Sequence, residues 1–216
     1  MKNIIIEVAV QSYSECLLAI KNGANRVEIF ENFPQGGTTP SYGTIKACVE
    51  KLKIPSVVML RPRGGNFIYS NDELDILRYD IGVCNSIKPY RVILGALDNT
   101  FNINYSVMQE LINLSKVDVA MHRAFDEVIE KYGINYALEQ INKLSNIGIK
   151  SLLSAGGKGS ALNQIDNLNK LLLECSKYNI ELVVAGKITK NDLPIVLQKV
   201  PAIAFHGRDI AGSIFN

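Results

Sequence analysis

Two histidines and two glutamates stand where their side chains could exchange protons with a bound molecule. The chain has no further histidine, and each follows an apolar run: Val-Ala-Met precedes His122, and Ile-Ala-Phe precedes His206. Glu7 and Glu28 also lie within apolar runs. Histidine changes charge near neutral pH, and carboxylates crowded in a partly dry site have shifted pKa values. The candidate catalytic residues are therefore Glu7, Glu28, His122 and His206.

A second group of residues could hold an anion. An apolar run ends at Leu60 and continues as Arg-Pro-Arg-Gly-Gly over residues 61–65. Proline favours an extended Arg61, and flexible glycines can turn backbone N–H groups towards an anion. With Arg123 beside His122, this tract suits a clamp for a phosphate or carboxylate. The candidate anion-binding residues are Arg61, Arg63, Asn66, Arg123, Asp126, Ser154, Gly156, Gly157, Gly186 and Lys187.

Each feature has a structural alternative. The histidines could be bonded to neighbouring carbonyl groups, the glutamates could be ion-paired with arginines such as Arg61, and residues 61–65 could be an ordinary turn. The loop over residues 154–160 is no Walker A motif, because Leu152 and Gly159 stand where glycine and serine or threonine are needed. It is still a candidate anion-binding loop before a helix, as are the glycines after the last two apolar runs.

Composition narrows the class of protein. The chain has 216 residues, a net charge of +2 and 47% hydrophobic residues, which indicates one globular domain without a nucleic-acid-binding surface. No apolar run is long enough for a membrane span, and we do not expect the first residues to act as a signal peptide. The cysteines lie far apart without CxxC spacing, which argues against disulfides or a local zinc site. We expect a cytoplasmic protein.

Eight short apolar runs, separated by segments of helical period, must position these residues. The predicted strands are residues 4–10, 26–30, 56–60, 91–94, 118–121, 151–153, 181–185 and 202–205. An open doubly wound sheet would favour glycines after its first strand, and residues 8–13 contain none. The pattern therefore predicts an α/β fold, a compact single-domain (β/α)₈ TIM barrel over residues 1–216. Its strands carry the candidate residues to one mouth.

Alternation along the strands assigns side chains to the two faces of the barrel. If Glu7 points inward, Ala9 does as well, because successive strand residues face opposite sides. By the same argument Phe30 follows Glu28 inward. His122 inward leaves Met121 facing the helices. The sequence therefore predicts that the candidate residues share the interior of the barrel with small and apolar side chains.

The motifs resemble those of the copper homeostasis protein CutC family. The similarity extends along most of the chain and includes residues 23–28, 36–43, 61–70, 95–97, 122–126 and 205–206. The resemblance implies a compact (β/α)₈ barrel, a cytoplasmic location and a homodimer or higher homo-oligomer. It also implies a role in copper homeostasis through intracellular Cu(I) binding.

The chain departs from the family pattern where copper would bind. The family's Glu-x-Cys after the first and second strands is replaced by Ala9 and Phe30, and its glycine triplet after the seventh strand is reduced. Cu(I) prefers thiolate or thioether ligands, and only Met59 and the two histidines could substitute. Three hypotheses stay open. They are a Cu(I)-handling protein, an enzyme acting on a small anionic substrate, and a zinc or manganese site of Glu7, Glu28, His122 and His206.

Overall fold

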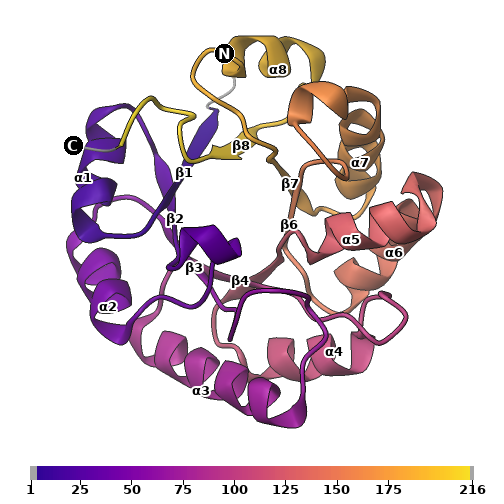
Figure 1. Ribbon diagram of the computed structural model, residues 1–216, viewed down its shortest axis with the longest axis horizontal. Helices are drawn as coiled ribbons and strands as arrows, with labels where there is room; N and C mark the ends of the chain where they lie inside the picture. Colours follow the sequence, from indigo (N-terminus) through magenta and orange to yellow (C-terminus); the bar gives the residue numbers. More distant parts are fainter. Residues whose placement is uncertain (1–3, 215–216) are drawn as a thin grey trace.

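The strands form a closed barrel in the computed structural model, which describes residues 4–214. Within this range eight parallel strands pair in sequence order, and β8 returns to β1 (Figure 1). Their bounds are β1 Ile5–Val10, β2 Arg26–Ile29, β3 Ser56–Met59, β4 Arg91–Leu94, β5 Asp118–Met121, β6 Ser151–Ser154, β7 Glu181–Val184 and β8 Ala204–Gly207. The predicted TIM barrel is confirmed, with β8 displaced by two residues from its predicted position.

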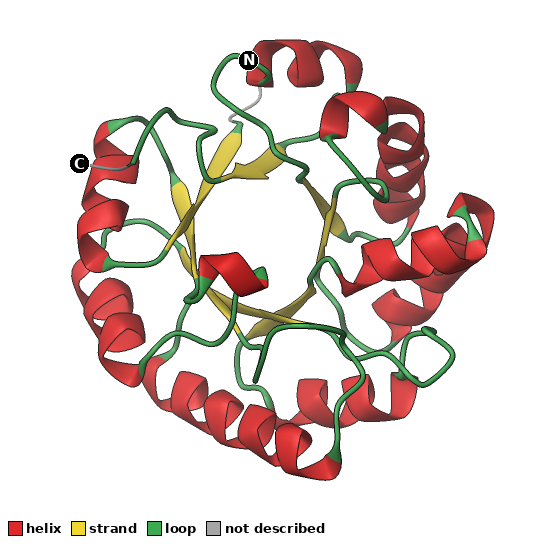
Figure 2. Ribbon diagram, viewed as in Figure 1, coloured by secondary structure: helices red, strands yellow, loops and turns green. Residues whose placement is uncertain are grey.

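The helices surround the barrel as an outer ring (Figure 2). They are α1 Tyr13–Lys21, α2 Tyr42–Lys51, α3 Asn71–Ile87, α4 Tyr105–Leu114, α5 Ala124–Tyr132, α6 Ile134–Asn146, α7 Ile165–Lys177 and α8 Leu193–Lys199. Two 3₁₀ helices, η1 Phe33–Gln35 and η2 Ala161–Asn163, lie in loops after strands. In the described range, no helix combines the length and apolar character needed to cross a membrane.

Local sequence signals set the helix ends. Ser70 and Glu73 form a reciprocal capping box at the start of α3, as their spacing predicts. Gly23 and Gly148 lie just past α1 and α6 with φ angles of 101° and 100°. Only glycine adopts such angles readily, so it ends a helix at little cost. These short, well-defined turns bring each helix back to the next strand.

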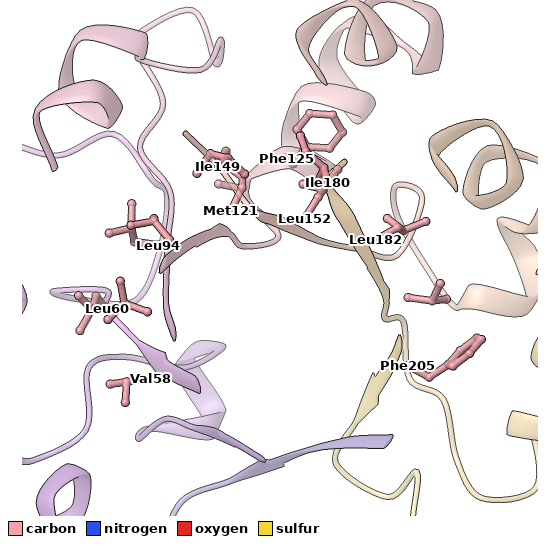
Figure 3. Close-up of a cluster of buried hydrophobic side chains, with 14 of the residues drawn as sticks. Val58, Leu60, Leu94, Met121, Phe125, Ile149, Leu152, Ile180, Leu182 and Phe205 are labelled. Atoms are coloured by element: carbon pink, nitrogen blue, oxygen red, sulfur yellow. The ribbon is translucent and has the colours of Figure 1, made fainter. Parts of the chain in front are cut away.

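Alternation along the strands produces two apolar layers. Outward-facing residues such as Leu60, Leu94, Met121 and Phe205 pack between barrel and helices (Figure 3). A smaller cluster, which includes Val57, Ile93, Ala120, Leu153, Val183 and Ala204, fills the barrel interior. Parallel strands buried on both faces need such continuous apolar runs. The outward position of Met121 agrees with the predicted parity and turns its neighbour His122 inward.

Candidate active site at the barrel mouth

Inward-facing residues at the ends of the strands line a cavity of about 220 Å³. Five of the predicted site residues contribute to it: Glu28, Arg61, His122, Arg123 and His206. Ala9, Phe30 and Met59 supply much of the apolar wall, as the parity argument predicts. A concave site with a few convergent polar groups in an apolar wall is typical of small-molecule binding.

The first and last strands bring Glu7 and His206 together. The two residues are register partners in the β1–β8 ladder, and Nδ1 of His206 lies 2.9 Å from Oε1 of Glu7. The same nitrogen is 3.2 Å from Oε2 of Glu28 on β2. Glu7 also accepts a hydrogen bond of 2.5 Å from Nε of Arg26. One histidine thus faces two carboxylates. Among residues 4–214, Glu7 has a guanidinium partner and Glu28 has none.

The environment separates the pKa values of the two carboxyls. Burial opposes ionisation of Glu7, but the charge of Arg26 and the hydrogen bond with His206 outweigh it and lower its pKa to about 2. Burial dominates at Glu28 and, with the negative charge of Glu7, raises its pKa to about 7. Burial also opposes protonation of His206, yet Glu28 and Glu7 together raise its pKa. Carboxyls with widely separated pKa values are typical of acid–base sites.

His122 lies in a different environment. Its Nδ1 accepts a hydrogen bond of 3.2 Å from the backbone N–H of Ala124, the first residue of α5. Burial and then the nearby charge of Arg61 lower the pKa of His122 to about 3. The Phe67 ring packs against the imidazole, with 4.7 Å between ring centroids. His122 is therefore neutral at physiological pH, whereas the carboxylates favour a charged His206.

Arg61 is buried at the mouth, and no carboxylate of the described residues is paired with it. Its guanidinium donates to the carbonyl groups of Gln35 at 3.1 Å and Gly37 at 2.9 Å, and also to that of Gly65. It lies over the Phe67 ring, 4.6 Å from the centroid. Among residues 4–214 no carboxylate lies within 4.0 Å of it, so the alternative of a glutamate paired with Arg61 does not occur. Its charge is available to an anion.

The structure does not bring Arg63 and Asn66 to the cavity. Arg63 turns back into its own loop, where it bonds the Glu73 carboxylate at 2.5 Å and the carbonyl groups of Asn66 and Ile68. Oδ1 of Asn66 accepts a hydrogen bond from the same guanidinium. These two residues shape the loop, and the predicted clamp is reduced to Arg61 and Arg123.

A carboxylate of the chain occupies the predicted anion loop after β6. Asp126 accepts hydrogen bonds from Oγ of Ser154 at 2.6 Å, from the N–H of Ala155 and from Nε of Arg123 at 2.7 Å. Burial outweighs these interactions and raises the pKa of Asp126. Gly156 directs its own N–H to Oγ of Ser154. The groups predicted to bind an external anion here already have internal partners.

The remaining glycine positions serve packing. A side chain at Gly157 would come within 2.9 Å of the Glu130 carboxylate, and one at Gly186 within 2.6 Å of the Ala161 backbone. Lys187 is exposed after β7, with a positive φ of 56°. Neither Gly186 nor Lys187 lines the mouth cavity.

Arg26 is a functional neighbour that sequence reasoning missed. It begins β2 and bridges Glu7 to Glu181, whose other oxygen is 3.0 Å from Arg91. Arg26 lies two residues before Glu28, so the same parity rule that turned Glu28 inward would have found it. Its position identifies the partner that holds Glu7 ionised.

The donor atoms at the mouth suit a hard metal better than Cu(I). Ligand atoms of Glu7, Glu28 and His206 lie within 4.8 Å of one another, so three of the four residues of the zinc or manganese hypothesis meet, without His122. Met59 is the sulfur-bearing residue among those that line the described cavity. A site of carboxylates and imidazole does not fit the preference of Cu(I) for soft ligands.

The cysteines lie elsewhere, buried beneath the helices. Cys16, Cys48, Cys84 and Cys175 occur on α1, α2, α3 and α7. The sulfurs of Cys16 and Cys48 are 3.6 Å apart. Their hydrogen bond is the largest influence on both thiols, and it raises the pKa of Cys16 and lowers that of Cys48.

Comparison with known proteins identifies relatives of the whole chain. The "Copper homeostasis protein cutC homolog" of Homo sapiens is 32% identical over 203 residues, covering 94% of this chain and 72% of the relative. A family protein CutC of Bacteroides fragilis is 33% identical over 208 residues, covering 95% and 80%. The crystal structure of CutC from Streptococcus agalactiae matches with a TM-score of 0.88 and 27% identity over 96% of this chain and 99% of that one.

More distant barrels share the fold alone. N-acetylneuraminate lyase from Mycoplasma synoviae has a TM-score of 0.65 at 11% identity, covering 99% of this chain and 72% of that one. The model of the CutC family matches residues 4–210, nearly the whole chain. The chain belongs to the CutC family, of which the relative from Homo sapiens is named a copper homeostasis protein.

Proposed function

We propose that the barrel mouth is an active site that transfers protons on a small anionic molecule. The observation that carries this proposal is the arrangement of Glu7 and Glu28 around one nitrogen of His206, with carboxyl pKa values of about 2 and about 7. A group that is half-protonated near neutral pH both accepts and returns a proton readily. Glu28 meets this requirement.

The three residues have distinct roles in the proposal. Glu7 stays ionised beside Arg26 and orients the ring of His206 through Nδ1. This leaves Nε2 of His206 as the ring atom that exchanges protons with a ligand. Glu28 is the second acid–base group. The arrangement follows the general pattern of a base oriented by a third group.

Charge at the mouth supports an anionic ligand. The guanidinium of Arg61 has no carboxylate partner among the described residues. Burial lowers the pKa of Arg61, but an arginine starts from so high a pKa that it stays charged. It lines both the inner cavity and an adjoining outer one of about 470 Å³. A phosphate or carboxylate would compensate the charge of Arg61 and gain a strong, charge-assisted hydrogen bond.

The test is a search for chemical change. The protein is incubated with a panel of small phosphorylated and carboxylated hydroxy- and oxo-acids, and ¹H NMR follows each compound. We expect at least one compound to be converted by the native protein, and Glu28→Gln to lower the rate by at least about 100-fold. Glu50→Gln, an exposed change on α2, is the matched control and keeps the native rate. Conversion of no compound, or equal rates in all three proteins, would refute the proposal.

Copper handling is a second candidate function, supported by a different observation. Relatives carry copper homeostasis names, and the buried thiols of Cys16 and Cys48 lie 3.6 Å apart between α1 and α2. Two thiols at this separation offer Cu(I) a pair of sulfur ligands, whereas Met59 is the sulfur-bearing residue among those that line the described mouth cavity. Anaerobic competition with a chromogenic Cu(I) chelator tests this role. Binding that is lost in Cys16→Ser and kept in Cys84→Ser supports it, and unchanged binding in both rules out the pair.

Two further expectations stay predictions. We expect a homodimer or higher homo-oligomer, which light scattering coupled to size-exclusion chromatography tests. We also expect a cytoplasmic location, which fractionation of the source cells tests. Neither expectation bears on the chemistry of the mouth.

A further inference from the structure

The neutral histidine at the mouth has a fixed tautomer. Nδ1 of His122 accepts the N–H of Ala124 at 3.2 Å, so the single ring proton of the neutral form is on Nε2. Ala124 begins α5, and the positive end of this helix disfavours a second proton on the ring. Burial and Arg61 act in the same direction. His122 is therefore a hydrogen-bond donor through Nε2, and it is not a proton carrier.

Besides Nε of Arg61, two buried polar atoms of the residues that line the cavity lack hydrogen-bond partners within the described part of the chain. They are Nε2 of His122 and Oε1 of Glu28, from side chains that line the same cavity and are 3% and 1% exposed. Neither atom has a hydrogen-bond partner among the described residues. Buried polar atoms are nearly always paired, and an orphaned pair beside a cavity indicates groups that a ligand satisfies. One of these groups is a donor, and the other is an acceptor when Glu28 is ionised.

The position of the His122 ring depends on a glycine. A side-chain carbon at Gly95, just after β4, would lie 2.7 Å from both Cε1 and Nδ1 of His122. That distance is too short for any real contact, so the ring can occupy its place only because residue 95 has no side chain. Phe67 packs against the ring, and Ala124 holds Nδ1. The donor is thus held in place on several sides.

The two donors at the mouth differ in kind. The charged guanidinium of Arg61 matches a permanent anion, whereas a neutral N–H matches an oxygen whose charge develops during a reaction. A carbonyl oxygen is such a group, because it becomes an oxyanion when a proton leaves the adjacent carbon. A neutral imidazole stabilises this oxyanion without giving up its own proton. The ligand best suited to both donors has a carbonyl group and an anionic group.

We propose that the site binds a small oxo-acid or oxo-phosphate and removes a proton from the carbon next to its carbonyl group. The Glu28 carboxylate takes this proton. The C–H electron pair forms a carbon–carbon double bond, and the carbonyl π pair moves to the oxygen, which accepts a hydrogen bond from Nε2 of His122. Return of the proton from Glu28 to carbon reverses the flow, so no oxidant or co-reactant is needed. This inference rests on the proposed function and names its substrate class.

Deuterium exchange tests the inference. Pyruvate, 2-oxobutyrate and dihydroxyacetone phosphate are incubated with the protein in D₂O, and ¹H NMR follows the signals of the carbon-bound protons next to the carbonyl. We expect the native protein to accelerate exchange of at least one probe. We expect His122→Gln and Gly95→Ala each to slow it by about 100-fold or more, the usual effect of removing one oxyanion donor. Gly43→Ala, where a side chain meets nothing within 4 Å, keeps the native rate.

A measurement on the native protein covers the case in which a variant does not fold. Oxalate has the planar, charged shape of the enolate formed from pyruvate, and its binding should shift the ¹⁵N signal of Nε2 of His122 while the ring stays neutral from pH 6 to 8. Exchange that is insensitive to His122, or oxalate binding that leaves this signal unchanged, overturns the inference. If the protein converts a compound in a Glu28-dependent way but no deuterium enters that compound, the inference is also overturned, whereas the proposed function stands. If neither the compound panel nor the deuterium-exchange experiment shows any reaction, the inference and the proposed function are both refuted.

Discussion

The barrel interior is charged in two places, and the two differ in how the charges are compensated. At the starts of strands β2, β4 and β7, Arg26, Arg91 and Glu181 form a chain of ion pairs that also reaches Glu7, with each charge within 3.0 Å of an opposite one. At the mouth, the Arg61 guanidinium has no carboxylate partner among the described residues, and Arg61, Glu28 and His122 each leave one buried polar atom unpaired.

This difference distinguishes buried charged groups that stabilise the fold from buried groups that are available to bind a ligand. The network neutralises its own charges, although Nη2 of Arg26 and Nε of Arg91 have no hydrogen-bond partner among the described residues. Losing one member of such a network is costly. Uncompensated groups lower stability unless something binds them, so a fold retains them where binding is useful. Glu7 and His206 connect the two places, because Glu7 pairs with Arg26 on one side and His206 on the other.

The largest effect is expected from Arg26→Met. Removing this guanidinium leaves Glu7 without its strongest partner and Glu181 with Arg91 alone, all largely buried. Breaking a buried ion pair typically costs about 3–5 kcal/mol, and we expect a loss of this size in the free energy of unfolding by urea. Arg61→Met serves as the comparison and should cost less, because Arg61 has no carboxylate partner in residues 4–214. Equal losses would contradict the distinction between the two places.

The second prediction concerns pH. The pKa of Glu28 is raised from 4.5 to about 7, so its stabilising contribution is complete below pH 4.5 and is lost as the pH rises through 7. The pKa of Glu7 is lowered from 4.5 to about 2, so its contribution is complete above pH 4.5 and is lost as the pH falls towards 2. At about 1.4 kcal/mol per pH unit, each difference amounts to about 3 kcal/mol.

Free energies of unfolding measured from pH 3 to 9 check the direction of the pH dependence that is expected for Glu28 and for Glu7. Relative to the native protein, Glu28→Gln should become more stable as the pH rises from 4.5 to 7. Glu7→Gln should be less stable than the native protein above pH 4.5, and this difference in the free energy of unfolding should shrink as the pH falls below 4.5. Slopes of the same sign for the two variants would show that the two carboxyls do not occupy opposite environments.

The smallest effect is expected from Arg63→Met. Arg63 lies two residues from Arg61, yet its ion pair with Glu73 is partly exposed, with 37% and 24% of the two side chains accessible. Such pairs contribute at most about 1 kcal/mol, so the free energy of unfolding should change little. Binding of an anionic probe such as oxalate, followed by calorimetry, should also be unchanged, whereas Arg61→Met should abolish it. Weaker binding in Arg63→Met would show that the loop reaches the mouth.

The fold and the meeting of the site residues could be predicted because both follow from periodicity. Apolar runs of the right length give strands, parallel strands bring their carboxyl ends to one mouth, and alternation decides the face. This reasoning placed Glu7, Glu28, His122 and His206 inside the barrel. The same reasoning could have identified Arg26, since it lies two residues before Glu28 and faces the same side.

The loop residues could not be predicted in the same way, because no period governs a loop. Arg63 and Asn66 follow a strand end, as a clamp would, but they fold onto each other. The loop after β6 has the expected glycines, but its N–H groups bond partners within the chain: that of Ala155 bonds Asp126, and that of Gly156 bonds Oγ of Ser154. Competition between internal and external partners depends on the three-dimensional course of the loops, which sequence spacing alone does not encode.

The pairing of Glu7 with His206 also has a consequence for how the molecule folds. The two residues lie 199 positions apart, on the first and last strands, and they meet only when β8 closes against β1. Contacts between such distant parts of a chain form late, since a long loop must first be closed. The raised pKa of His206 depends on this closure, so the protonation of one imidazole during refolding reports the moment at which the barrel is complete.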